Sequence, residues 1–112
     1  MEKISDILKA LSDETRLRIL NILCEKELCV CDIMETLQIS QAKASRHLIY
    51  MKNAGLLKDR KSAQWVYYSM ASDEGMKFID SLVFDDLRNM EPYKNDLQSL
   101  RDWLEHKKIK CE

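Results

Sequence analysis

The chain has 112 residues, of which 46% are hydrophobic and 33% charged, a balance that fits one small globular domain. No apolar run approaches the roughly 18 residues of a membrane span, and two Gly and one Pro leave no flexible linker. The first ten residues combine charge with helical periodicity, unlike a signal peptide. We therefore expect a single domain over residues 1–112, located in the cytoplasm and without a membrane segment.

The hydrophobic pattern in the first half of the chain predicts helices over residues 2–11, 13–26, 30–37 and 41–54. Ser12 is expected to cap the second helix and Ser40 the fourth. Gln38 and Ile39 form a tight break between the third and fourth helices, and Gly55 is a natural end for the fourth.

The second half begins with two predicted strands, 56–61 and 65–70, joined by Ser62-Ala63-Gln64. Helical spacing then resumes from about Asp73 and continues until Pro92 interrupts it. A last helix has an apolar seam, which either binds a partner helix or packs on its own domain; its members are Tyr93, Leu97, Leu100 and Leu104. A short helix, a turn, a capped helix and a hairpin follow the winged helix-turn-helix order, so the fold is predicted as mainly α with a small β-hairpin.

The net charge of −1 hides a basic segment over residues 41–64, where six cationic side chains against Asp59 alone give +5. Such a segment on an acidic body is typical of a surface that binds nucleic acid, with a solvated charged face as the alternative. At 100° per residue, one side of the fourth helix is expected to pack inward, through Ala44, His47, Leu48 and Met51. His47 is thus interpreted as a core histidine rather than a metal ligand.

The opposite side of this helix suits a DNA major groove because small and hydrogen-bonding residues accompany an arginine near the helix N-terminus. We expect Gln41 and Arg46 to reach base edges, and Lys43 and Ser45 to reach phosphates. Three hairpin cations are predicted to lie near a flanking phosphate or minor groove, unless they only solubilise the surface; these are Lys58, Arg60 and Lys61.

The four cysteines, at positions 24, 29, 31 and 111, are spaced too unevenly for a disulfide framework. In a reducing compartment, clustered cysteines more often bind metal or sense redox state. Thiolates select soft ions, a group that includes Zn, Cu(I) and, by the same logic, As(III) and Sb(III). Residues two apart in a regular helix point about 200° away from each other, so Cys29 and Cys31 would need a frayed or unwound first turn to share an ion.

Three stretches resemble the ArsR/SmtB family of dimeric bacterial and archaeal metal-sensing repressors: LSDETRLRIL, ISQAKASRHLIYMKNAGLL and ELCVCDI. They look like the family's second helix, its recognition helix with strand entry, and the inducer motif of its arsenic-sensing branch. The resemblance implies a homodimer formed mainly by the first and last helices, an operator with two half-sites, and release of DNA on inducer binding. By position, Gln41, Ser45 and Arg46 match DNA-contacting residues.

Cys29 and Cys31 match the inducer thiolates of this branch, but its best-known form has a third cysteine where this chain has Met34. Cys24 either packs in the core or supplies the third ligand, and Cys111 either reaches across a dimer or is a thiol of the tail. A small free thiol is a further way to complete the site. Residues 73–90 contain no His, so the family's zinc site on its fifth helix is expected to be absent, and the wing tip lacks its usual Gly.

The leading hypothesis is a dimeric, DNA-binding transcriptional repressor that As(III) or Sb(III) releases from its operator, with no cofactor required. The alternatives are a thiol redox or persulfide switch, a sensor of another soft metal such as Cd(II), and a helical interaction module that binds no DNA. No nucleophile elbow, phosphate loop or metalloprotease motif is present, so we expect no enzyme.

Overall fold

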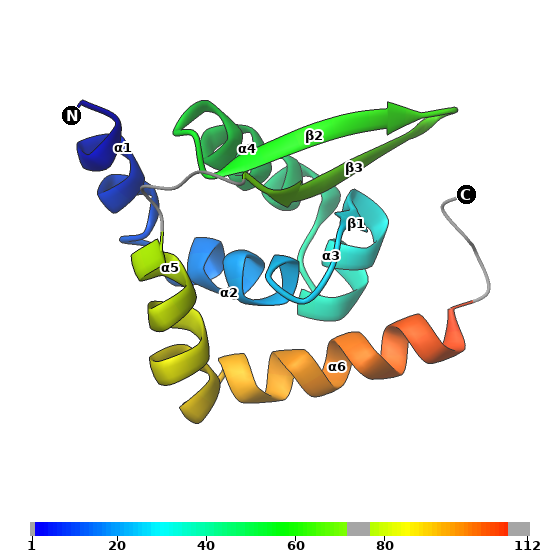
Figure 1. Cartoon of the computed structure of the whole chain (residues 1–112). Coiled ribbons are helices and arrows are strands. Elements are labelled where there is room, and N and C mark those ends of the chain that lie inside the picture. The colour runs from blue at the N-terminus through cyan, green and yellow to red at the C-terminus, as the bar shows by residue number, and fades with distance from the viewer. Residues whose placement is uncertain (1, 72–76, 108–112) are drawn as a thin grey trace.

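The computed structural model describes residues 2–71 and 77–107, in which helices pack together with a small antiparallel sheet that lies along one side of the molecule (Figure 1). The elements of the first half are α1 (Glu2–Ala10), α2 (Glu14–Leu23), β1 (Leu28–Cys29), α3 (Val30–Leu37) and α4 (Gln41–Asn53). They are followed by β2 (Leu57–Ser62), β3 (Trp65–Met70), α5 (Lys77–Ser81), η2 (Leu82–Asp86), η3 (Leu87–Asn89) and α6 (Tyr93–His106). The hairpin and α4 lie on one side of the molecule and α6 on the other, with α2 and α3 between them (Figure 1).

The start of α2 differs from the prediction by one residue. Asp13, not Ser12, is the cap: its backbone is extended and its carboxylate accepts the Arg16 backbone N–H at 3.0 Å. A carboxylate at this position also interacts favourably with the helix dipole, which a hydroxyl does not. Ser12 instead donates its hydroxyl to the Lys9 carbonyl at 2.6 Å, and α2 ends at Leu23 rather than near Lys26.

The helix-turn-helix itself is confirmed. Gln38 ends α3 with a left-handed φ of 56°, and Ser40 caps α4 by accepting the Lys43 backbone N–H at 3.1 Å. Gly55 follows α4 at φ 90°, a conformation that glycine adopts without steric cost. The sequence signals for these boundaries are local, so they do not depend on the packing around them.

The sheet has one strand more than predicted, in the order β1-β3-β2. Strand β1 pairs antiparallel with β3 and places Cys29 opposite Tyr67. Two residues are too short to show an alternating pattern, so this strand carried no sequence signal. In the hairpin, Ser62 pairs with Trp65, and Ala63 takes the left-handed φ of 55° that a glycine would normally supply.

The region before Pro92 is less regular than the continuous helix predicted. A short α5 passes into a π-helical turn at η2 and a 3-10 turn at η3, while Asp73 and Met76 lie outside the described residues. Helix α6 begins at Tyr93 as expected. Its seam packs on its own domain: Tyr93, Leu97 and Leu100 are buried, and Leu104 packs against the core. Among the described residues, no helix is both long and apolar enough to cross a membrane.

Candidate ligand cavity and nucleic-acid interface

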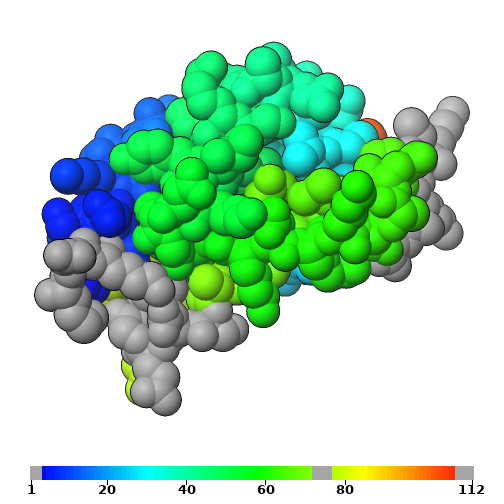
Figure 2. All heavy atoms as spheres, turned by 90° about the horizontal axis from the view of Figure 1, so that it is seen from above, coloured from blue at the N-terminus to red at the C-terminus, as the bar shows by residue number. Residues whose placement is uncertain are grey.

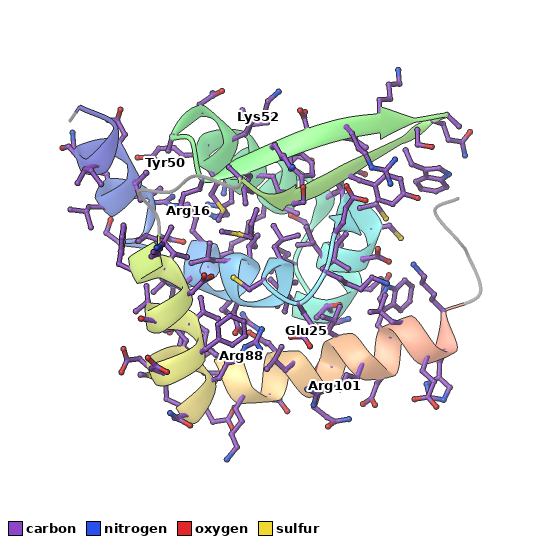
Figure 3. The ribbon with its side chains drawn as sticks, viewed as in Figure 1. Arg16, Glu25, Tyr50, Lys52, Arg88 and Arg101 are labelled. Carbon is purple, nitrogen blue, oxygen red and sulfur yellow. The ribbon has the colours of Figure 1, made fainter. Side chains whose placement is uncertain are left out.

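The inner face of α4 is buried as its helical periodicity predicts. Ala44, Leu48 and Met51 are fully buried, and His47 is 9% exposed. The His47 ring packs beside α2, with its Nδ1 3.4 Å from Nη1 of Arg16, and burial lowers its pKa. The same Arg16 lies over the Tyr50 ring at 4.4 Å (Figure 3). His47 is therefore a core residue that helps to hold α4 on α2.

The outer face of α4 presents the residues predicted to contact DNA. Gln41 and Arg46 are exposed, while Lys43 and Ser45 are partly exposed. The three hairpin cations on β2 are exposed as well, and they are Lys58, Arg60 and Lys61. Figure 2 views the molecule from this side, where α4 and the hairpin form one continuous surface. The fold thus brings the predicted contacts together, and their binding to DNA stays a prediction.

Arg60 has a carboxylate partner at the base of the wing. Its Nη2 lies 2.8 Å from Oε1 of Glu27, its Nε lies 2.9 Å from Oε2, and its guanidinium lies 4.6 Å from the Tyr67 ring centre. The hydrogen bonds from Arg60 hold the pKa of Glu27 below its usual value. These contacts give Arg60 a role in joining the wing to β1 besides any contact with DNA.

Cys29 and Cys31 do not share a helical turn. Cys29 ends β1 and precedes α3 with an extended backbone (φ −89°, ψ 168°), whereas Cys31 lies in the first turn of α3. The predicted helix over residues 30–37 agrees with α3, and Cys29 lies before it, so the expectation that the pair needs an unwound first turn is wrong. The 200° separation of a regular helix does not apply to this pair, so the helix need not unwind for both side chains to face one space.

The two cysteines line one cavity of about 380 Å³. Its wall is formed by residues from the start of α3, from the first position of α4 and from the wing, namely Cys29, Val30, Cys31, Met34, Gln41, Gln64, Trp65 and Val66. Cys29 also packs on Tyr67, with Cys31 and Trp65 beside them. A ligand held by the cysteines would consequently lie against α4 and the wing, the two elements predicted to contact DNA.

Cys24 is placed elsewhere. It follows α2 as its C-cap residue, packs against the main core and is not part of the cavity wall. Burial raises the pKa of the Cys24 thiol to about 11. The pKa of Cys31 is also raised, first by burial and then by the negative charges of Asp32 and Glu35. Cys111 lies outside the described residues.

The ligands of a complete metal centre are not assembled in the described part of the chain, where no group of three His, Cys, Asp or Glu side chains could hold an ion. Met34 lines the cavity at the position where the family's arsenic motif has its third cysteine. Cys29 is disulfide-bonded in the structure, whereas Cys31 is a free thiol, so the expectation that the cysteines form no disulfide is wrong at Cys29. The pair can offer two sulfur ligands only after that disulfide is reduced, and a third ligand would come from outside this set.

Sequence reasoning missed several residues around the cavity. Trp65 and Gln64 enter it through the pairing of the wing with β1, which the sequence did not reveal. Asp32 is 3% exposed and accepts the Cys29 backbone N–H at 3.2 Å. An acidic residue three positions after a helix cap is a known start signal, so this contact was within reach of sequence analysis.

Comparison with known proteins places the chain in a family of regulators. The signature described as "Bacterial regulatory protein, arsR family" matches residues 13–59. An arsenic resistance transcriptional regulator of Pseudomonas putida is 44% identical over 78 residues, which are 69% of this chain and 60% of that protein. The chain thus spans less than two thirds of the length of this relative.

Two further matches cover more of the related protein. A cadmium resistance transcriptional regulatory protein CadC homolog of Staphylococcus aureus is 47% identical over 72% of this chain and 67% of its own length. The structure of reduced HlyU from Vibrio cholerae is 36% identical and aligns with a TM-score of 0.69 over 77% of this chain and 90% of that one. The chain belongs to the ArsR family and has its winged helix-turn-helix fold.

Proposed function

We propose that this ArsR-family protein is a dimeric, DNA-binding transcriptional repressor that As(III) or Sb(III) releases from its operator by binding to cysteine thiolates. The observation that carries the proposal is the shared cavity, whose wall combines Cys29 and Cys31 with Gln41 of α4 and Trp65 of the wing. A soft ion bound there displaces residues of both DNA-facing elements at once. The proposal places the protein in the cytoplasm, where thiols remain reduced.

The chemistry follows from the thiols. Arsenite in neutral water is As(OH)₃, and each As–S bond forms as one thiol replaces one hydroxyl and a water molecule leaves. Cellular thiols first reduce the disulfide at Cys29 by thiol–disulfide exchange. Cys29 and Cys31 then supply two such bonds, with no net change in protons. Because thiol hydrogens leave as water, the raised pKa of Cys31 slows the reaction without opposing its equilibrium.

The proposal leaves several candidates for the third ligand of the ion. Cys24 is outside the cavity wall and its thiol is held in the core, which argues for packing. Cys111 and a small free thiol remain as proposals, and a hydroxyl retained on arsenic would serve with two protein thiols alone. Single substitutions of each cysteine distinguish these cases.

We also propose a homodimer, as the family resemblance implies. Several apolar side chains are exposed on α1, on α5, on η2 and just after η3, and they are Leu8, Phe78, Phe84 and Met90. Helices α1 and α5 lie near each other at one end of the molecule (Figure 1), and exposed apolar side chains on these elements support an interface there. A two-fold dimer would present two α4 helices to an operator with two half-sites.

The decisive test is binding to DNA from upstream of the protein's own operon, titrated with arsenite, antimonite, cadmium and zinc. We expect arsenite and antimonite to release the wild type, and Cys29→Ser and Cys31→Ser to stay bound. Normal release by either variant would contradict the site. If Cys24→Ser and Cys111→Ser both respond like the wild type, two protein thiols suffice.

A response to Cd(II) is the second candidate, because one relative at 47% identity is named for cadmium resistance. Release by cadmium at lower concentrations than arsenite would favour it. A redox switch is a further candidate, because Cys29 is disulfide-bonded in the structure. The raised pKa values of Cys24 and Cys31 argue against these two as its sensing thiols, because low-pKa thiols are the ones that oxidise readily. Release by peroxide in the absence of any metal would favour that alternative.

A further inference from the structure

Asp32 is a buried carboxylate that joins the cysteine-bearing turn to the far end of the chain. Its Oδ2 accepts the backbone N–H of Cys29 at 3.2 Å. Its Oδ1 accepts two donors from α6 and its C-cap: Trp103 Nε1 at 2.8 Å and Lys107 Nζ at 2.9 Å. One side chain therefore connects residues that are more than 70 positions apart in sequence.

Capping of α3 does not account for this arrangement. To cap a helix, an acidic residue in the first turn needs only one hydrogen bond, from the backbone N–H of the cap residue. That role does not require the carboxylate to be buried. Here the Asp32 side chain is 4% exposed and the Lys107 side chain 17%. Burial of a carboxylate is costly unless charge and hydrogen bonds compensate it, and α6 supplies both. The buried link therefore holds α6 and the start of α3 in one relative position.

The link reaches further through the other half of α6. Asp96, which is 1% exposed, accepts Arg18 Nε and Nη2, each at 2.8 Å. Helix α6 is thus fixed to α2 near its N-terminus and to α3 near its C-terminus. Because both ends of α6 are held by hydrogen bonds, a displacement at the Asp32 end is expected to tilt the whole helix relative to α2.

We propose that Asp32 is a positioning residue that transmits ligand binding at Cys29 and Cys31 to α6, an inference that rests on the proposed function. Once the disulfide at Cys29 is reduced, drawing its sulfur and that of Cys31 onto one ion moves the Cys29 backbone N–H, whose acceptor is Asp32. Because both oxygens belong to one planar carboxylate, its rotation also misaligns the bonds to Trp103 and Lys107. Helix α6 packs on η3, and η3 packs on η2 at the proposed dimer interface, so a shift of α6 alters the spacing of the two α4 helices in the dimer.

The chain's two tryptophans report the two ends of this link separately. Trp65 lines the cavity and Trp103 donates to Asp32. Trp65→Phe leaves Trp103 as the single emitter, and Trp103→Phe leaves Trp65. In the full-length reduced protein, arsenite should change both emissions over the same concentration range. If Asp32 only stabilised the fold, the Trp103 emission would not change when arsenite binds.

Asp32→Asn is the main test, and Asp102→Asn is its matched control on the exposed side of α6. We expect Asp32→Asn to abolish the Trp103 response while Trp65 still reports arsenite binding. Arsenite should lower the operator affinity of wild type and control at least about tenfold, and that of Asp32→Asn less than about twofold. If Asp32→Asn fails to fold, Lys107→Met tests the same link, with the same outcome expected.

The outcomes separate this inference from the proposed function. The link would be overturned if Asp32→Asn and Lys107→Met both released operator DNA on addition of arsenite as the wild type does. It would also be overturned if arsenite left the Trp103 emission unchanged. Either result would leave the proposed cysteine site intact. A Trp65 emission that does not respond to arsenite in the otherwise unaltered protein would overturn the proposed function and, with it, this inference.

Discussion

Two cysteine-bearing regions lie five residues apart in sequence and differ in almost every physical respect. Cys24, at the end of α2, packs against the core beside a polar network, whereas Cys29 and Cys31 face a cavity bordered by the wing and α4. The first region is closed and lies among the helices. The second is open and lies between α4 and the wing, the two elements proposed to contact DNA. Nearness in sequence therefore does not make these three cysteines one site.

The closed region is held together by hydrogen bonds between buried polar groups, because a buried polar group without a partner costs free energy. Asn21 is fully buried, donates its amide to the Tyr93 carbonyl at 3.0 Å and accepts Arg88 Nε at 3.0 Å. Arg88 also pairs with Glu25 at 3.0 Å, as the side chains in Figure 3 show. We infer that this side carries stability while the open side carries the response, and the predictions below test that division.

The largest expected difference is in thiol reactivity. With a pKa of about 11 against an ordinary 9.0, Cys24 has about 100-fold less thiolate near neutral pH than an unperturbed thiol. A pulse of iodoacetamide on Cys29→Ser, followed by mass spectrometry of tryptic peptides 19–26 and 27–43, compares Cys24 with Cys31. Cys31 should be modified first, and the Cys24 rate should rise about tenfold per pH unit towards pH 11. Equal rates, or a plateau near pH 9, would contradict the closed environment.

Asn21→Ala tests whether the closed region supplies stability. The change leaves the Tyr93 carbonyl and Arg88 without their buried partner, so the free energy of unfolding should fall by about 2 kcal/mol. Urea denaturation measures this, with an unchanged slope expected because the exposed surface is the same. The exposed Asn53→Ala is the matched control. A loss no larger than the control's would mean that the network is dispensable.

The sequence was most informative where the signals are local. Periodicity located α3 and α4, Ser40 marked the start of α4, and Gly55 its end. The inward face of α4, including His47, also followed from helical geometry alone. A short sequence motif, ELCVCDI, likewise identified Cys29 and Cys31 as candidate ligands. Their role as ligands is still a prediction.

Contacts between distant segments were out of reach. Strand β1 exists because the wing returns beside Cys29, and two residues carry no pattern of their own. The bonds from Trp103 and Lys107 to Asp32 depend on where α6 packs. Periodicity could not decide whether the seam of α6 faces a partner or its own core, because both are apolar surroundings.

Arg46→Ala separates DNA recognition from ligand binding on the open side. Arg46 is exposed on the outer face of α4, so its loss should lower operator affinity by about 1–2 kcal/mol, or roughly tenfold. Binding in a gel-shift or anisotropy titration at fixed salt measures this. Arg101→Ala is the matched control, since Arg101 lies on the exposed side of α6, away from the hairpin (Figure 3). A Trp65 response to arsenite that changed with Arg46→Ala would show that the two functions of this side are not separable.

Glu27→Gln should have the smallest effect, although it breaks an ion pair that joins β1 to the wing. The Arg60 and Glu27 side chains are 48% and 33% exposed, and pairs so open to water contribute no more than about 0.5 kcal/mol. Because the folded pKa of Glu27 is lowered, its contribution is fully present above the ordinary value of 4.5 and is lost as pH falls through the folded value. Thermal unfolding of both proteins should therefore differ slightly at neutral pH and converge in acid. A fall of more than about 1 kcal/mol in the free energy of unfolding would contradict the division, because the open side would then contribute to stability. The pair would in that case hold the wing, and with it one wall of the cavity, in position.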